Sequence, residues 1–69
     1  MELEQYSKDL FKAIKTLKDH ATESNIFRKL YPKYKYLTTM YFNDAINKLE
    51  FEGKIIKKNS GGVIWWESI

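Results

Sequence analysis

The sequence predicts an α+β fold in which three helices precede a two-stranded β-hairpin, forming a single domain over residues 1–69. Three segments repeat apolar residues at steps of three and four, the spacing that places side chains on one face of a helix. Gly53 then marks a helix end, and a turn-forming stretch, Asn-Ser-Gly-Gly, separates two short segments of strand composition. A chain this small buries roughly 60% of the surface that its unfolded form exposes, so one modest core is expected.

The first helix is expected over residues 3–19. The apolar residues that predict it recur at helical spacing and are Leu3, Tyr6, Leu10, Ala13, Ile14 and Leu17, with Ala21 continuing the row into the break that follows. This row extends further toward the N-terminus than a small three-helix core requires. A second role in dimerisation or partner binding is therefore predicted for Leu3, Tyr6 and Leu10.

The second helix is expected to begin after Thr22, a good N-cap residue, and to run for about nine residues. Its apolar face would consist of Ile26, Phe27, Leu30 and Tyr31. Pro32 is expected to stop it, because the residue before a proline is pushed out of the α region. Residues 32–37 then interleave lysine with tyrosine. They are either a stacking platform of the kind that binds single-stranded nucleic acid, or tyrosines that close the core.

The third helix is expected over residues 38–52, with Thr38 or Thr39 as its N-cap. Its core residues would be Phe42, Ala45, Ile46 and Leu49, which fall on one face of a helical wheel. The other side carries Met40, Tyr41, Asn43, Asp44, Asn47, Lys48 and Phe51. Gly53 suits the position that follows a helix end.

The hairpin is expected to pair residues 54–58 with residues 63–68 across a turn at residues 59–62. The first strand is rich in lysine, and the second contains Trp65 and Trp66. Because successive side chains of a strand point to opposite faces, one tryptophan must pack inward while the other meets solvent or a partner. The pattern leaves open which one is exposed. Trp66 and Phe51 are assigned to a candidate protein interface.

Charge is distributed unevenly along the chain, which has a net charge of +3 and a pI near 9.2. Residues 1–27 carry four lysines and five acidic residues, for −1, whereas residues 28–69 carry eight Lys or Arg and four acidic residues, for +4. A basic half that contains the third helix and the hairpin suits a polyanionic partner. Only one of the twelve cations is arginine, which argues against extensive bidentate readout of guanine.

Other classes of protein find little support in the composition. There is no cysteine and a single histidine, and no His or Asp spacing typical of a metal site is present, so neither an enzyme nor a cofactor is expected. No apolar run approaches membrane-spanning length, and the first ten residues do not resemble a signal peptide. We therefore expect a cytoplasmic protein, or one in the nucleoid or nucleus if it binds DNA.

Two segments resemble the winged helix family. Residues 47–68, NKLEFEGKIIKKNSGGVIWWES, are similar to the end of a recognition helix followed by the wing, and residues 9–30, DLFKAIKTLKDHATESNIFRKL, are similar to the first two helices. The resemblance covers nearly the whole chain and implies a helix-turn-helix fold with a hairpin wing. Members of this fold serve as transcription regulators, replication components and protein-interaction modules, so it does not fix the function.

One branch of that family, the Zα domains that bind left-handed nucleic acid, offers a narrower comparison. Counted from the helix-ending glycine, Asn43 and Trp65 match that branch's phosphate-contacting asparagine and its wing tryptophan. If the resemblance holds, they would contact phosphate and support the reading face. The tyrosine of that branch is replaced by Asn47, and its paired prolines by Gly62 and Val63. Binding of Z-form nucleic acid is therefore a lesser alternative.

The leading hypothesis is a small transcriptional regulator, dimeric, that docks its third helix in the major groove of double-stranded DNA. The residues predicted to contact DNA are Thr38, Thr39, Met40, Tyr41, Asn43, Asp44, Asn47, Lys48, Lys57, Lys58, Asn59 and Ser60. Asparagine suits adenine, Met or Tyr suits the thymine methyl group, and the hairpin lysines suit backbone phosphate. The competing hypothesis is a protein-interaction module, or homodimer, that uses Phe51, a hairpin tryptophan and the first helix.

Overall fold

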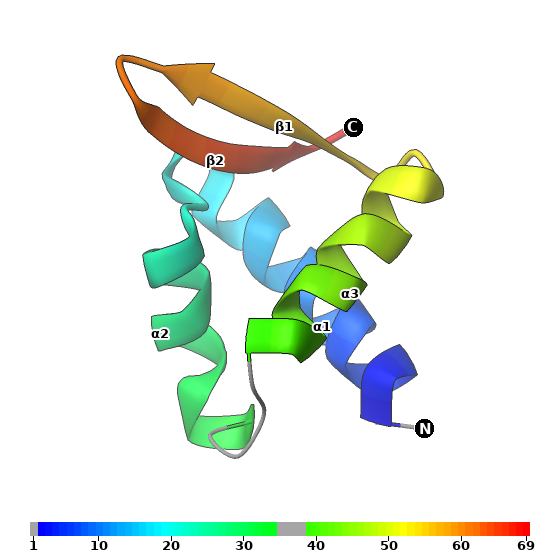
Figure 1. The fold of residues 1–69 in the computed structure, drawn as a ribbon. Coiled ribbons are helices and arrows are strands. Elements are labelled where there is room, and N and C mark those ends of the chain that lie inside the picture. Colours follow the sequence, from blue (N-terminus) through cyan, green and yellow to red (C-terminus); the bar gives the residue numbers. More distant parts are fainter. Residues whose placement is uncertain (1, 35–38) are drawn as a thin grey trace.

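The computed structural model describes residues 2–34 and 39–69, with the backbone alone at residues 2, 3 and 39. Three α-helices precede a two-stranded antiparallel hairpin, which is an α+β arrangement with winged helix topology (Figure 1). The predicted fold class is confirmed. The elements are α1 (Glu2–Leu17), the 3-10 turn η1 (Lys18–His20), α2 (Glu23–Tyr34), α3 (Thr39–Phe51), β1 (Ile55–Ser60) and β2 (Val63–Ser68).

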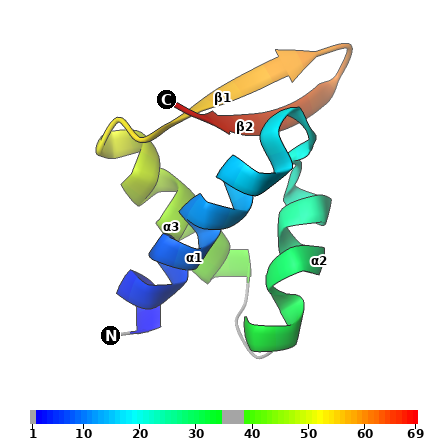
Figure 2. The same ribbon diagram turned by 180° about the vertical axis from the view of Figure 1, so that it is seen from behind.

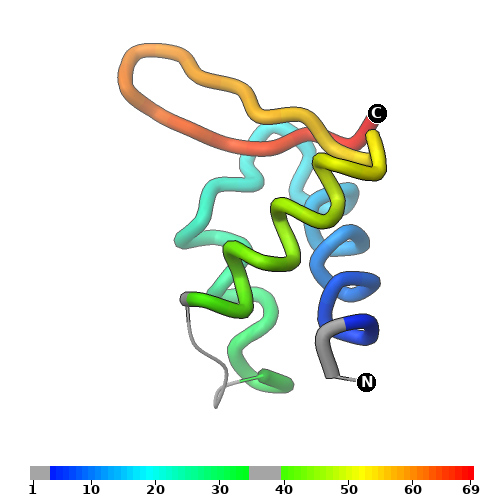
Figure 3. The backbone as a smooth tube through the Cα atoms, turned by 45° about the vertical axis from the view of Figure 1, so that its right-hand side comes forward, coloured from blue at the N-terminus to red at the C-terminus, as the bar shows by residue number. Residues whose placement is uncertain are grey.

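Helix α1 is the central support of the fold, because it contacts both α2 and α3 (Figure 2). The hairpin lies across one end of the three helices, as the tube in Figure 3 shows. It is tied there by a backbone hydrogen bond of 3.1 Å in which the Trp66 N–H donates to the Ala21 carbonyl, in the segment after α1. None of the helices described is long and apolar enough to cross a membrane.

The core forms where the apolar faces of the three helices meet the inner face of the hairpin. Its buried side chains are Tyr6, Leu10, Ala13, Ile14, Ala21, Ile26, Leu30, Tyr34, Phe42, Ala45, Ile46, Leu49, Ile55 and Trp66. All four residues predicted for the core face of α3 are buried. Phe27 packs against Phe42 at 4.7 Å between ring centroids, which joins α2 to α3 beneath the hairpin.

Helix α1 ends earlier than predicted, at Leu17 instead of residue 19. The next residue, Lys18, has φ +54, in the left-handed region that an α-helix cannot contain, and it is the first residue of the short 3-10 turn η1. Helix α2 then starts after Thr22, whose Oγ1 accepts a hydrogen bond of 3.3 Å from the Asn25 N–H, as expected of an N-cap residue.

The predicted end of the second helix is wrong, because α2 continues through Pro32 to Tyr34. Its last turn is held to α1 by Asp9, which accepts hydrogen bonds from the Tyr34 hydroxyl at 2.5 Å and from Lys33 Nζ at 3.0 Å. Tyr34 is buried, whereas Tyr31, predicted on the apolar face, is 55% exposed. These tertiary contacts outweigh the local preference of the residue before proline, and the rest of the predicted 32–37 connection lies outside the described residues.

The end of α3 confirms the role predicted for Gly53. The Gly53 N–H donates to the Glu50 carbonyl and the Lys54 N–H to the Leu49 carbonyl, both at 3.0 Å, which is the Schellman pattern. Gly53 has φ +74, a conformation that costs little only for glycine. The motif turns the chain sharply, so that β1 starts directly over the helix end.

The hairpin turn is tighter than predicted, with two residues instead of four. Gly61 and Gly62 have φ values of +57 and +84, as a turn with two left-handed central residues requires. Asn59 and Ser60, predicted in the turn, belong to β1, where they pair with Ile64 and Val63.

Candidate nucleic-acid interface

The exposed side of α3 is polar near its middle and apolar at both ends. Asn43, Asp44 and Asn47 are exposed, while Met40 is 71% and Phe51 93% exposed. Tyr41, predicted to meet DNA, is instead partly buried against the core, with its ring 6.4 Å from that of Tyr6. Thr38 and the side chain of Thr39, the predicted phosphate site at the helix start, lie outside the described residues.

A crevice of about 250 Å³ separates α3 from the hairpin. Its lining residues come from α2, α3 and both strands, and are Glu23, Phe42, Asn43, Lys57, Ile64 and Trp66. Asn43 stands on the α3 side, and Lys57 on the hairpin side, where it pairs with Trp66 in register. The fold therefore brings together one polar residue of the predicted reading helix and one predicted phosphate-binding lysine.

The two hairpin lysines do not share a face. Since side chains alternate along a strand, Lys57 lies on the face that carries the buried Ile55 and Trp66, whereas Lys58 lies on the outer face. Both are exposed, and neither forms an ion pair within residues 2–34 and 39–69. Lys57 alone of the two lines the crevice. Asn59 follows on the inner face, and Ser60 on the outer face.

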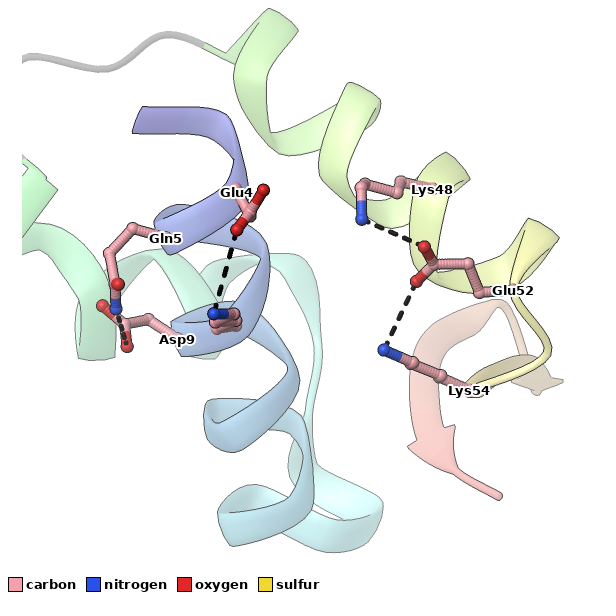
Figure 4. A network of polar contacts seen from close by, with 7 residues as sticks. Glu4, Gln5, Asp9, Lys48, Glu52 and Lys54 are labelled. Carbon is pink, nitrogen blue, oxygen red and sulfur yellow. Dashed lines mark hydrogen bonds and ion pairs between the residues drawn. The ribbon is translucent and has the colours of Figure 1, made fainter. Parts of the chain in front are cut away.

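Lys48 is engaged within the protein. Its Nζ donates to Glu52 Oε2 at 3.0 Å, and Lys54 Nζ lies 3.5 Å from Glu52 Oε1 (Figure 4). The pKa of Glu52 lies below its ordinary value because Lys48 donates this hydrogen bond and both lysines add positive charge. Glu52 partly offsets the charge that Lys48 would offer to a phosphate. Asp44 adds negative charge on the exposed side of α3, and Glu23 adds negative charge in the crevice.

The tryptophans resolve the alternative that the sequence left open, and they require a correction. Trp66 is buried, with 8% of its surface exposed, and its indole N–H donates to Glu50 Oε2 at 3.2 Å. Trp65 lies on the outer face, partly exposed, with its N–H donating to Glu67 at 2.8 Å. The assignment of Trp66 to a protein interface is therefore wrong.

The same correction applies to most of the predicted interface on the first helix. Tyr6 and Leu10 are 2% and 0% exposed because both α2 and α3 pack on that side of α1. Tyr6 lies edge-on to Tyr34 at 5.0 Å between ring centroids. Phe51 remains available on the surface, and the side chain of Leu3 lies outside the described residues.

The Zα comparison also changes in one respect. The tryptophan that shares the crevice with Asn43 is Trp66, whereas Trp65, the residue matched by sequence counting, faces away from α3. Asn43 therefore lies on the side of α3 that meets the inner face of the hairpin, whereas Trp65 lies on the outer face, so the two residues do not share a site.

A second polar cluster, at the other end of α2, was missed by sequence reasoning. Asp9 accepts from Tyr34, Lys33 and Gln5, and the hydrogen bond from Tyr34 is the main reason that the pKa of Asp9 lies below its usual range. Burial, followed by this contact with Asp9, raises the pKa of Tyr34. The one sequence signal that could have suggested this cluster is the position of Asp9, a charged residue beside the apolar row of the first helix, where a hydrogen-bond partner is needed. Across the two described segments, no group of three His, Cys, Asp or Glu residues could hold a metal ion.

No family model, curated protein or solved structure matches this chain. The geometry of the α3 and hairpin surface therefore provides the basis for a functional hypothesis.

Proposed function

We propose that this protein is a transcriptional regulator that binds duplex DNA with α3 and the inner face of its hairpin. The observation that carries the proposal is the crevice in which Asn43 of α3 and Lys57 of β1 face the same space. A helix alone can contact bases, but nothing fixes its position along the DNA groove. A cation held on a second element, at the side of that helix, supplies the phosphate contact that sets the register.

The roles follow from the chemistry of the exposed side chains. Asn43 and Asn47 have the donor and acceptor pair that matches adenine in the major groove, and Met40 offers an apolar contact for the thymine methyl group. Lys57 would bind a phosphate beside the helix. Asp44 would repel phosphate, so it must point at a base edge, where cytosine offers an amino donor.

The proposal is tested by titrating the protein with mixed-sequence duplexes at several salt concentrations. Binding should weaken steeply with salt, because each lysine–phosphate contact releases counterions. Replacing Asn43 or Asn47 by alanine should change which sequence is preferred, whereas replacing Lys57 should weaken binding to all sequences alike. Absence of association with any duplex at low salt would refute the proposal. A duplex in the Z form, included in the same series, tests the Zα alternative.

A second candidate function is protein binding through the end of α3. Phe51 is 93% exposed, which leaves its ring free to contact a partner, and aromatic residues are enriched at protein interfaces. This hypothesis expects Phe51→Ser to abolish a protein complex and leave DNA binding intact. Affinity purification with the wild-type and the F51S proteins distinguishes the two, since a partner retained equally by both would exclude this site.

A further inference from the structure

The outer face of the hairpin carries three apolar side chains although no described element covers it. A hairpin with one face on the core normally carries polar residues on the other face. Here the register places Ile56, Val63 and Trp65 together on the outer side. Ile56 is 47% and Val63 53% exposed, and Trp65 is partly exposed. We call these three residues the outer patch.

Two opposite charges lie beside the outer patch on the same face of the hairpin. Lys58 pairs with Trp65 in register, and Glu67 pairs with Ile56, so the two charged residues occupy diagonal positions. Lys58 forms no ion pair with the residues described. Glu67 Oε2 accepts a hydrogen bond of 2.8 Å from the indole N–H of Trp65, which holds the Glu67 carboxylate on this face. A patch with one cation and one anion at diagonal positions is complementary to its own copy.

We propose that the outer patch is a homodimer interface, in which the hairpins of two copies pack face to face about a two-fold axis. Strands lie about 4.8 Å apart and residues about 3.4 Å apart along each strand. With this spacing, a two-fold axis that lies in the plane of the hairpin, along the diagonal from Ile56 to Trp65, brings Lys58 over Glu67 of the second copy. The same axis lays Ile56 over Ile56 and Trp65 over Trp65. Both ion pairs form at once, as the symmetry of such an interface requires.

This arrangement goes beyond the proposed DNA binding and does not rest on it. The strands of the two sheets would cross steeply, as in orthogonally packed sheets. The crevice with Asn43 and Lys57 lies on the opposite side of the hairpin and stays open in both copies. The two hairpin lysines thus acquire different tasks, Lys57 toward nucleic acid and Lys58 toward the second copy.

Sedimentation equilibrium of the whole chain without DNA, from about 10 µM to about 1 mM, tests the proposal in the range expected of a small interface. The wild-type protein should dimerise. Lys58→Glu and Glu67→Lys should each weaken dimerisation at least about tenfold, because like charges then meet across the interface. An equimolar mixture of K58E and E67K should form a heterodimer, since both of its ion pairs are restored.

Controls separate this interface from other effects. Phe51→Ser removes an exposed aromatic residue outside the outer patch and should leave the dimer unchanged. Ile56→Thr keeps a β-branched residue in the strand and should weaken the dimer without unfolding the chain, as circular dichroism would confirm. A wild-type monomer at every concentration, or a K58E and E67K mixture that fails to associate, would overturn the proposal and leave the face to a different partner.

Discussion

Replacing Lys57 by glutamine removes the positive charge that the hairpin holds in the crevice beside Asn43, while keeping most of the side chain. If Lys57 binds one phosphate, the slope of log affinity against log salt should become shallower by about 0.9. At about 0.1 M salt this corresponds to a loss of about eightfold in affinity, from the same relation. Because Lys57 is exposed and forms no ion pair with the residues described, fold stability should change little.

Fluorescence anisotropy with a labelled duplex, between about 50 and 200 mM salt, measures both quantities. Lys12→Gln is the matched control, because Lys12 has the same charge and is exposed, but lies on α1, outside both the crevice and the outer face of the hairpin. Its slope should stay within about 0.3 of the wild-type value if it touches no phosphate. An unchanged slope for K57Q, or equal losses for both variants, would refute the assignment of Lys57 to the DNA side.

Three further predictions concern charge, side-chain hydrogen bonds and backbone conformation. Asp44→Asn should raise affinity for mixed duplexes about two- to fivefold in the same assay, because repulsion of phosphate is removed, whereas Glu4→Gln on α1 should not. Asp9→Asn should lower the free energy of unfolding at neutral pH by about 1–2 kcal/mol in urea titrations. The reason is that the Tyr34 hydroxyl and the Lys33 ammonium group both lose a charged hydrogen-bond acceptor. Gly53→Ala should cost about 1 kcal/mol in the same titrations, from backbone strain at φ +74 and not from a clash, because nothing lies within 4 Å of the added Cβ.

The pH dependence of the Asp9 variant gives an independent check. The pKa of Asp9 in the folded state lies below its ordinary value of 3.8, so its contribution is fully present above that pH and is lost as the pH falls through the folded-state pKa. The wild type should therefore lose its advantage over D9N on acidification below about pH 4. Equal loss of stability in both proteins over that range would contradict the role given to Asp9.

The parts of the fold that the sequence predicted correctly are those set by local chemistry. The core face of α3 follows from helical spacing, which places Phe42 and Leu49 on one side whatever packs against them. Gly53 was identifiable because the left-handed residue that closes a Schellman motif is usually glycine. The order of helices and hairpin followed from helical spacing in three segments, from Gly53 and from the Asn-Ser-Gly-Gly turn.

The features that the sequence could not predict depend on tertiary contacts. The extension of α2 through Pro32 depends on Asp9 holding Tyr34, a contact between residues 25 positions apart. The inward tryptophan depends on the hairpin register, which a one-residue shift would reverse. Because Lys57 pairs with Trp66, the inward position of Trp66 also places Lys57, and not Lys58, on the face toward α3. The sequence did not distinguish the two lysines, so it predicted the candidate site only in part.

The central claim, that the crevice side of α3 and the hairpin binds duplex DNA, is tested most directly by an NMR titration of backbone amides with a mixed-sequence duplex. The account predicts that the amide signals of Asn43, Asn47 and Lys57 shift together and in proportion to bound DNA, while the signal of Phe51 stays in place. Shifts confined to Phe51 and the outer patch, or no shifts at low salt, would contradict it.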